Sequence, residues 1–198
     1  MSYQPKAEEI KALREETSAP MMDCRKALVD AAGDLARAKA LLLERGAAAA
    51  AKKAERTANE GLIASYIHAG GKIGVLVEVN SETDFVARSP RFAELTRDLA
   101  MHIAAMSPEY VDRESVPREV LEQLRGEFRS NVPAGKPSDV AEKIVEGKLN
   151  RWCEEHCLLD QAFVKDDSIS VADVINGAVG SLGERIRVRR FAKYALGE

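Results

Sequence analysis

The amino-acid sequence predicts an α+β protein, with a small three-helix domain over residues 1–55 and a larger α+β core over residues 56–198. Three observations support this fold class. Apolar residues recur at helical spacing over most of the chain. Two stretches between residues 62 and 79 instead alternate apolar residues with polar or small ones, which is the period of a strand with one buried face. A third alternating stretch lies near residue 187, so we predict a three-stranded antiparallel sheet packed by helices.

The first 55 residues have the pattern of three short helices. Pro20 suits the first turn of the second helix, because its ring fixes φ near the helical value. Asp34 follows Gly33 in a turn and can cap the third helix, which is expected to end at Gly46. The apolar positions of the three helices are, in chain order, Ile10 and Leu13, then Met22, Cys24 and Leu28, then Leu35, Ala38 and Leu42.

The next segment leads into the predicted sheet. Alanine costs little to order in a helix, so the alanine-rich run at residues 47–58 should form a connecting helix. The alternating stretches at residues 62–66 and 73–79 are predicted to pair as antiparallel strands through a tight turn at residues 68–71.

The rest of the core is predicted to be mostly helical. Ser89 and Pro90 form a good helix start, and that helix should end near Met106. Two further helices fall within residues 117–157 and can pack as an antiparallel pair. A turn at residues 165–168 should precede the last helix. The apolar positions of these helices are Phe92, Leu95, Leu99 and Ile103, then Val120, Leu121, Leu124 and Phe128, then Val140, Ile144, Leu149, Trp152 and Cys153, then Val171, Val174, Ile175, Val179 and Leu182.

A short polar connector, residues 80–88, joins the second strand to the next helix and contains one aromatic residue, Phe85. Two interpretations of this connector stay open. Thr83 or Asp84 can cap an early helical turn, with Phe85 and Val86 folded back as a local hydrophobic staple. Alternatively, the connector is a rigidly mounted loop that presents Phe85 to a partner, since binding residues concentrate on loops and aromatic side chains anchor interfaces.

The charge balance argues against nucleic acid as the main partner. The chain has 29 Lys and Arg against 32 Asp and Glu, a formal net charge of -3, whereas phosphate binding needs concentrated positive charge. The last strand alternates Ile186 and Val188 with three arginines, and we expect its basic side to be a solvated face that nearby acids partly neutralise. Protein partners fit this balance better.

The composition, 45% hydrophobic and 31% charged, is typical of a soluble globular protein. No apolar run approaches the roughly 20 residues that a membrane helix needs, so we expect no membrane association. The first 16 residues are charged and lack the apolar stretch of a signal peptide, which predicts a cytoplasmic location.

The three cysteines, Cys24, Cys153 and Cys157, are too few for a disulfide scaffold and are expected to be reduced thiols. Cys153, His156 and Cys157 lie within about one helical turn, so three soft ligands can face the same way. A structural zinc site needs a fourth ligand from a second segment, and the sequence has no second Cys/His pair. We therefore predict an ordinary helix face and no metal.

The sequence contains no constellation for catalysis. It lacks a GxxxxGK phosphate loop, a quartet of metal ligands, and a Ser, His and Asp set whose neighbours would activate a nucleophile. The prediction is a protein that acts by binding, with no catalytic residue and no cofactor.

Five segments carry a resemblance to a known family. The hallmark is the run Thr83-Asp84-Phe85-Val86-Ala87-Arg88. The other four are residues 13–17 with 21–28 (LREET and MMDCRKAL), 74–78 (GVLVE), 135–137 with 141–147 (GKP and AEKIVEG), and 187–191 (RVRRF). These segments, in this order and over nearly the whole chain, resemble bacterial elongation factor Ts, the guanine nucleotide exchange factor of elongation factor Tu.

The resemblance implies a ubiquitin-associated-like fold for residues 1–55 and a protruding helical pair. It also implies two sets of residues that contact elongation factor Tu. The central set is Thr83, Asp84, Phe85 and Val86, and the secondary set is Met21, Met22, Arg25, His68 and Leu182.

Met21 and Met22 follow a loop that differs from the usual pattern of the family. From the residues alone, Met21 and Met22 are core fillers, the usual role of methionine, although their place at a turn predicts that at least one is exposed. Where the family usually has Gly-Ala-Gly before this pair, the present chain has Ser18-Ala19-Pro20. Two flexible residues are absent, so this loop is expected to be stiffer.

By resemblance, Phe85 would insert between helices of elongation factor Tu beside the nucleotide, with Asp84 fixing its approach. Moving those helices displaces groups that hold the magnesium ion, and losing the ion weakens the hold on the diphosphate. An exchange protein that binds nucleotide-free elongation factor Tu more tightly than the GDP-bound form must weaken GDP binding by the same ratio.

The number of subdomains predicts an assembly. Longer family members contain two related strand-and-helix subdomains, whereas this sequence shows one, between residues 60 and 106. Two chains pairing through their sheets would restore the double core, giving a homodimer that holds two elongation factor Tu molecules. The alternative class is an RNA-associated interaction protein with a basic C-terminal strand, which predicts tight RNA binding that weakens steeply with salt.

Overall fold

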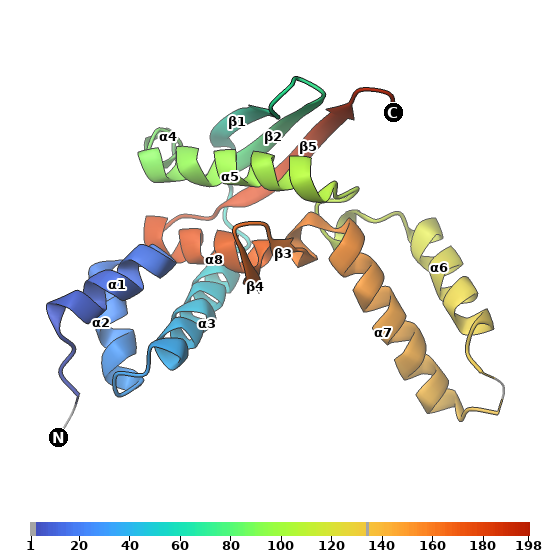
Figure 1. The fold of residues 1–198 in the computed structure, drawn as a ribbon, viewed down its shortest axis with the longest axis horizontal. Coiled ribbons are helices and arrows are strands. Elements are labelled where there is room, and N and C mark those ends of the chain that lie inside the picture. The colour runs from blue at the N-terminus through green and yellow to red at the C-terminus, as the bar shows by residue number, and fades with distance from the viewer. Residues whose placement is uncertain (1–2, 134) are drawn as a thin grey trace.

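The structure of the chain is a computed structural model that describes residues 3–133 and 135–198. Figure 1 shows a group of N-terminal helices, a central sheet with helices packed beneath it, and a pair of helices that extends away on the other side. The α+β prediction is confirmed. Within the described residues, no helix is both long enough and apolar enough to cross a membrane.

The N-terminal helices are α1 (Ala7–Thr17), α2 (Met21–Asp30) and α3 (Leu35–Lys53). They enclose a small hydrophobic cluster of their own, in which Leu13, Cys24 and Leu28 are fully buried. Asp34 caps α3 as predicted, since its side chain accepts a hydrogen bond from the backbone N–H of Arg37 at 3.1 Å.

Gly46 does not end the third helix, contrary to the sequence-based expectation. The helix runs through it to Lys53, and the predicted separate helix over residues 47–58 is not formed. Gly46 is buried where α3 packs along α8 (Val171–Leu182). A Cβ atom at this position would lie 3.1 Å from the carbonyl oxygen of Asn176 in α8, so the glycine permits close approach of the two helices.

The sheet is antiparallel and has the order β1-β2-β5, which confirms the predicted three strands. Its members are β1 (Glu60–Ile67), β2 (Ile73–Ser81) and β5 (Arg187–Ala195). Val75, Val77 and Val79 of β2 point to the inner face and are buried. The register of β2 with β5 shifts between Glu78 and Val79.

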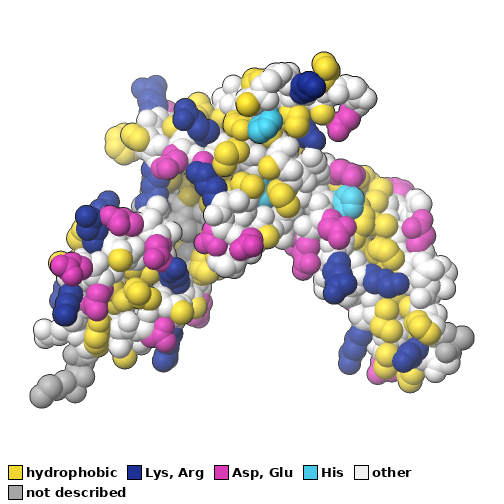
Figure 2. Space-filling view, viewed as in Figure 1, with side chains coloured by type: hydrophobic (Ala, Val, Ile, Leu, Met, Phe, Trp, Pro, Cys, Tyr) yellow, Lys and Arg dark blue, Asp and Glu magenta, His cyan; other side chains and the backbone are white. Residues whose placement is uncertain are grey.

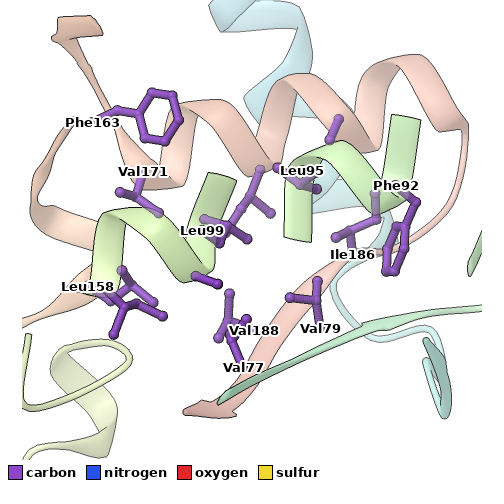
Figure 3. Close-up of a cluster of buried hydrophobic side chains, with 14 of the residues drawn as sticks. Val77, Val79, Phe92, Leu95, Leu99, Leu158, Phe163, Val171, Ile186 and Val188 are labelled. Atoms are coloured by element: carbon purple, nitrogen blue, oxygen red, sulfur yellow. The ribbon is translucent and has the colours of Figure 1, made fainter. Parts of the chain in front are cut away.

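The main core lies between this inner face and two helices. Helix α5 (Pro90–Met106) begins as predicted, with the Ser89 hydroxyl accepting a hydrogen bond from the Phe92 N–H at 3.3 Å. Figure 3 shows Phe92, Leu95 and Leu99 of α5 packed against valines of the sheet and against residues near α8.

The predicted helical pair is α6 (Arg118–Ser130) and α7 (Ser138–His156), which follow the short η1 (Arg113–Ser115). The pair extends away from the sheet and the N-terminal helices (Figure 1). Ion pairs join the two helices between Arg129 and Glu142 and, at 3.8 Å, between Arg125 and Glu146. A third hydrophobic cluster, with Val116, Cys153 and Cys157 buried, forms the base of the pair.

The turn predicted at residues 165–168 is wrong. After η2 (Leu158–Asp160), strand β3 (Ala162–Phe163) pairs with β4 (Asp166–Ser170), so the turn falls at residues 164–165.

A buried histidine fixes this hairpin to α5. Nδ1 of His102 accepts a hydrogen bond from the Val164 N–H at 3.2 Å, and Nε2 lies 2.9 Å from Oε1 of Gln161. Nε2 therefore carries the proton and donates to Gln161, in the neutral form of the ring.

Candidate partner-binding site

The polar connector folds as a one-turn helix, α4 (Asp84–Ala87), rather than an open loop. Thr83 caps it, since its hydroxyl accepts a hydrogen bond from the Val86 N–H at 3.4 Å. Asp84 forms an ion pair with Arg88 at 3.1 Å across this turn. The capping interpretation is therefore correct, but the staple interpretation is wrong for Phe85, because its ring is 83% exposed.

The residues that follow Phe85 anchor the turn in the main core. Val86 is only 6% exposed, and it is buried together with Ala87 in the cluster that contains Phe92. Val86 thus faces inward and positions the turn, while the neighbouring ring of Phe85 faces solvent. The exposed ring of Phe85 is therefore carried by a backbone turn that Val86 and Ala87 anchor in the main core.

The residues that precede Phe85 are held by a glutamate from a distant segment. One carboxylate oxygen of Glu184 accepts hydrogen bonds from the backbone N–H groups of Glu82 and Thr83, at 3.1 and 3.0 Å. Its other oxygen accepts from the Thr83 hydroxyl at 2.6 Å. Glu82 in turn accepts a hydrogen bond from the Arg185 N–H at 2.6 Å. Reasoning from the sequence did not identify Glu82 or Glu184.

The turn between α8 and β5 brings Glu184 to the connector. Gly183 ends α8 in the left-handed conformation, with φ of 77°. Leu182, a predicted contact residue, is the last residue of α8 and packs partly against the main core. The glycine at a helix end, followed by an acidic residue, was the one signal in the sequence that pointed to this turn.

Met21 and Met22 lie in the first turn of α2 and are 53% and 68% exposed, so neither is a core filler. Arg25 is exposed one turn later, whereas Cys24 between them is buried. Pro20 is the residue just before this helix and accepts hydrogen bonds from the backbone N–H groups of residues 23 and 24.

A groove of about 860 Å³ lies between the N-terminal helices and α5. Ser18 and Pro20 line one side of it, and Arg91 and Glu94 of α5 line the other. Figure 2 shows hydrophobic side chains at the surface of both the α4 region and the N-terminal helices, on the same side of the molecule. Both of these regions are thus open to solvent on that side of the molecule.

His68 lies elsewhere. It is exposed beside the turn between β1 and β2, where its Nδ1 is 3.1 Å from the hydroxyl of Tyr66. Strand β2 has nine residues and leads from that turn to the connector, so about 30 Å separates its two ends. The structure does not bring His68 to Phe85.

Comparisons with known proteins agree on one family. A family model described as Elongation factor TS matches residues 36–198. The chain is 53% identical over 193 residues to the Elongation factor Ts of Koribacter versatilis, covering 97% of this chain and 88% of that relative. It is 50% identical over 193 residues to the Elongation factor Ts of Caldanaerobacter subterraneus subsp. tengcongensis, covering 97% and 96%. The chain belongs to the elongation factor Ts family.

In this elongation factor Ts chain, the basic side of β5 is partly neutralised, as expected. Glu78 of β2 accepts hydrogen bonds from Arg189 at 3.2 Å and from Arg190 at 2.7 Å. The hydrogen bond from Arg190 is the main cause that lowers the pKa of Glu78 below its ordinary value.

The cysteines of this elongation factor Ts chain lie apart from the connector. Burial, and then the neighbouring Cys153 thiol, raises the pKa of Cys157 to about 12. His156 stacks on Trp152 with ring centroids 4.4 Å apart, and its Nδ1 lies 2.9 Å from a carboxylate oxygen of Glu109. Among the residues that the structure describes, no three His, Cys, Asp or Glu side chains are grouped to hold a metal ion.

Proposed function

We propose that this chain binds GDP-bound elongation factor Tu and promotes the exchange of GDP for GTP, acting by binding rather than by bond-making chemistry. The observation that carries this proposal is the 83% exposed ring of Phe85, mounted between a buried valine and a backbone held by Glu184. An exposed aromatic ring on a fixed support is a typical interface anchor. Membership of the elongation factor Ts family supports the choice of partner.

In this mechanism Phe85 inserts between helices of elongation factor Tu beside the nucleotide pocket, and Asp84 guides its approach. The helices that move carry groups that hold the magnesium ion, and without the ion the negative charge of the diphosphate is poorly compensated. GDP then dissociates faster. Binding equilibria are reciprocal. The ratio by which this chain prefers nucleotide-free over GDP-bound elongation factor Tu therefore equals the ratio by which it weakens GDP binding.

The other candidate contacts fit a docking role. Met21, Met22 and Arg25 are exposed, and Leu182 is the last residue before the turn that carries Glu184. These residues would supply affinity, while Phe85 would supply the displacement. The cytoplasm, where elongation factor Tu works, is the location that this function implies.

The test of the proposal is the rate of GDP release from elongation factor Tu, measured by stopped flow with fluorescently labelled GDP. For Phe85→Ala we expect the accelerated rate to fall by roughly tenfold or more, since a loss of about 1.4 kcal/mol in stabilisation of the transition state already lowers a rate tenfold. The affinity for nucleotide-free elongation factor Tu should fall less, because the docking contacts remain. Val164→Ala, which truncates an exposed apolar side chain on the β3–β4 turn, is the matched control. An unchanged release rate in Phe85→Ala would contradict the mechanism.

We also propose that two chains associate through the outer face of the sheet, so that the dimer holds two elongation factor Tu molecules. The inner face of β2 carries the buried valines, whereas the outer face carries Leu76 with neighbours from β1 and β5. Ile63, Ile67, Leu76 and Tyr194 on this outer face are all more than half exposed. Contiguous exposed apolar side chains of this kind are typical of protein interfaces.

A further inference from the structure

The orientation of Phe85 depends on the backbone that carries it. Its ring is 83% exposed, so side-chain packing does not fix its direction. Helix α4 has four residues, which is too short to be stable by itself. The direction of the ring is therefore set by what holds the chain on each side of it. Val86 and Ala87 hold the following side in the main core.

The preceding side is held by four residues that we name the carboxylate clamp: Glu82, Thr83, Glu184 and Arg185. Glu184 accepts three hydrogen bonds from Glu82 and Thr83, with lengths of 3.1, 3.0 and 2.6 Å. Glu82 accepts one from the Arg185 N–H at 2.6 Å. Each segment thus supplies a carboxylate to the backbone of the other. Hydrogen bonds to an ionised carboxylate are about twice as strong as neutral ones.

The clamp and the cap of α4 share one atom. The Thr83 hydroxyl donates to Glu184 and accepts from the Val86 N–H, so it passes the constraint directly to the turn that bears Phe85. We propose that Glu184 is a positioning residue of the exchange reaction, which sets the direction of Phe85 through Thr83. This inference rests on the proposed function and adds a residue to it.

The expected consequence is selective for rate. Without Glu184, the two backbone N–H groups and the Thr83 hydroxyl would turn to water, and residues 82–84 would sample other conformations. A displacement of about 1 Å at a reacting group can cost up to a hundredfold in rate. The clamp contains none of the proposed docking residues Met21, Met22 and Arg25. The affinity for elongation factor Tu should therefore change little.

Release of labelled GDP from elongation factor Tu is measured against the concentration of each variant, which separates the maximal rate from the half-saturating concentration. We expect Glu184→Ala to lower the maximal rate about tenfold and to leave the half-saturating concentration within about threefold. Glu184→Gln should retain most of the rate, because its amide oxygen can accept from both backbone N–H groups and its NH₂ can donate to Thr83.

The matched control is Asp160→Ala, which removes a carboxylate that joins two other segments by accepting a hydrogen bond from Arg113 at 2.8 Å. It should leave the maximal rate unchanged. An equal loss of rate in Asp160→Ala and Glu184→Ala would show a general loss of stability and overturn the positioning role.

Two further measurements complete the test. In a Phe85→Ala background, Glu184→Ala should cause no additional loss of rate, because the clamp acts through that ring; an additive loss would overturn the inference. Amide hydrogen exchange at Glu82 and Thr83 in the free chain should be faster in Glu184→Ala, and unchanged exchange would overturn the clamp itself. A wild-type chain that fails to accelerate GDP release would instead overturn the proposed function, whatever the exchange of these two amides shows.

Discussion

His102 gives the fold a dependence on mildly acidic pH. The ring is fully buried, and burial lowers its pKa below the ordinary value, with the hydrogen bond to Gln161 opposing part of that change. Its Nδ1 accepts a hydrogen bond from the Val164 N–H and cannot hold a proton without losing that bond. As the pH falls, His102 of the unfolded chain therefore binds a proton near pH 6.5, whereas His102 of the folded chain binds it only at a lower pH.

We expect the free energy of unfolding to be highest above pH 6.5 and to fall as the pH drops from there toward the lowered pKa of His102. The slope from this one group is at most about 1.4 kcal/mol per pH unit. His102→Gln keeps a donor and an acceptor but does not titrate, so its slope in this window should be smaller. Urea unfolding at several pH values between 7.5 and 5.5 measures both slopes. Equal slopes would show that His102 does not titrate differently in the two states.

Single residues also show which parts of the site the sequence can predict. The motif and the strand period placed Phe85 on a short connector, but they left open whether its ring folds back or faces solvent, and the structure decided for solvent. Glu184 could not be found in this way, since its partner Thr83 is 101 positions away and nothing local marks the pair. Likewise, Val86 belongs to the motif but is buried, and only the packing of the connector on the main core shows this.

At the scale of elements, Gly46 of α3 differs from two other glycines inside helices, Gly126 of α6 and Gly147 of α7. A Cβ atom at Gly46 would lie 3.1 Å from the backbone of α8, whereas a Cβ atom at Gly126 or Gly147 would meet no atom within 4 Å. Gly46→Val should therefore destabilise the fold by about 1–3 kcal/mol through overpacking. Gly126→Ala and Gly147→Ala should stabilise the helical pair by about 0.5–1 kcal/mol each.

Thermal unfolding followed by circular dichroism measures these changes as shifts of Tm in opposite directions. The two alanine variants serve as controls for Gly46→Val, because they also add side-chain atoms at a helical glycine. A Tm for Gly46→Val at or above that of the wild type would show that the α3–α8 contact can open at no cost.

The helix periods predicted α5, α6 and α7 closely, since each helix has one apolar stripe facing a neighbour. The same reasoning failed at Gly46 and at the β3–β4 hairpin. A glycine in a run of alanines has the same local signal whether it ends a helix or lies under another helix. Strand β3 has two residues, Ala162 and Phe163, so no alternation could reveal it.

At the scale of the whole molecule, the outer sheet face predicts the oligomeric state. Leu76 lies on the central strand of this face, and Leu76→Glu would place a carboxylate within the proposed contact between two chains. We expect light scattering at micromolar concentration to give twice the mass of one chain for the wild type and the mass of one chain for Leu76→Glu. Leu35→Glu, which adds the same charge at an exposed leucine of α3, should remain dimeric. A monomeric wild type would remove the dimer proposal.

The close packing of α3 on α8 has a consequence for partner choice. Helix α2, which carries the methionines, packs on α3; α3 packs on α8; and α8 leads into the turn that grips the base of Phe85. Because each of these elements packs on the next, we expect the distance between the methionines and Phe85 to be fixed by the fold. In the proposed complex, a protein would have to carry the binding sites for the methionines and for Phe85 at this same distance from each other. A protein with both sites at another distance would bind poorly, so selectivity would depend on the spacing of the sites as well as on individual side chains.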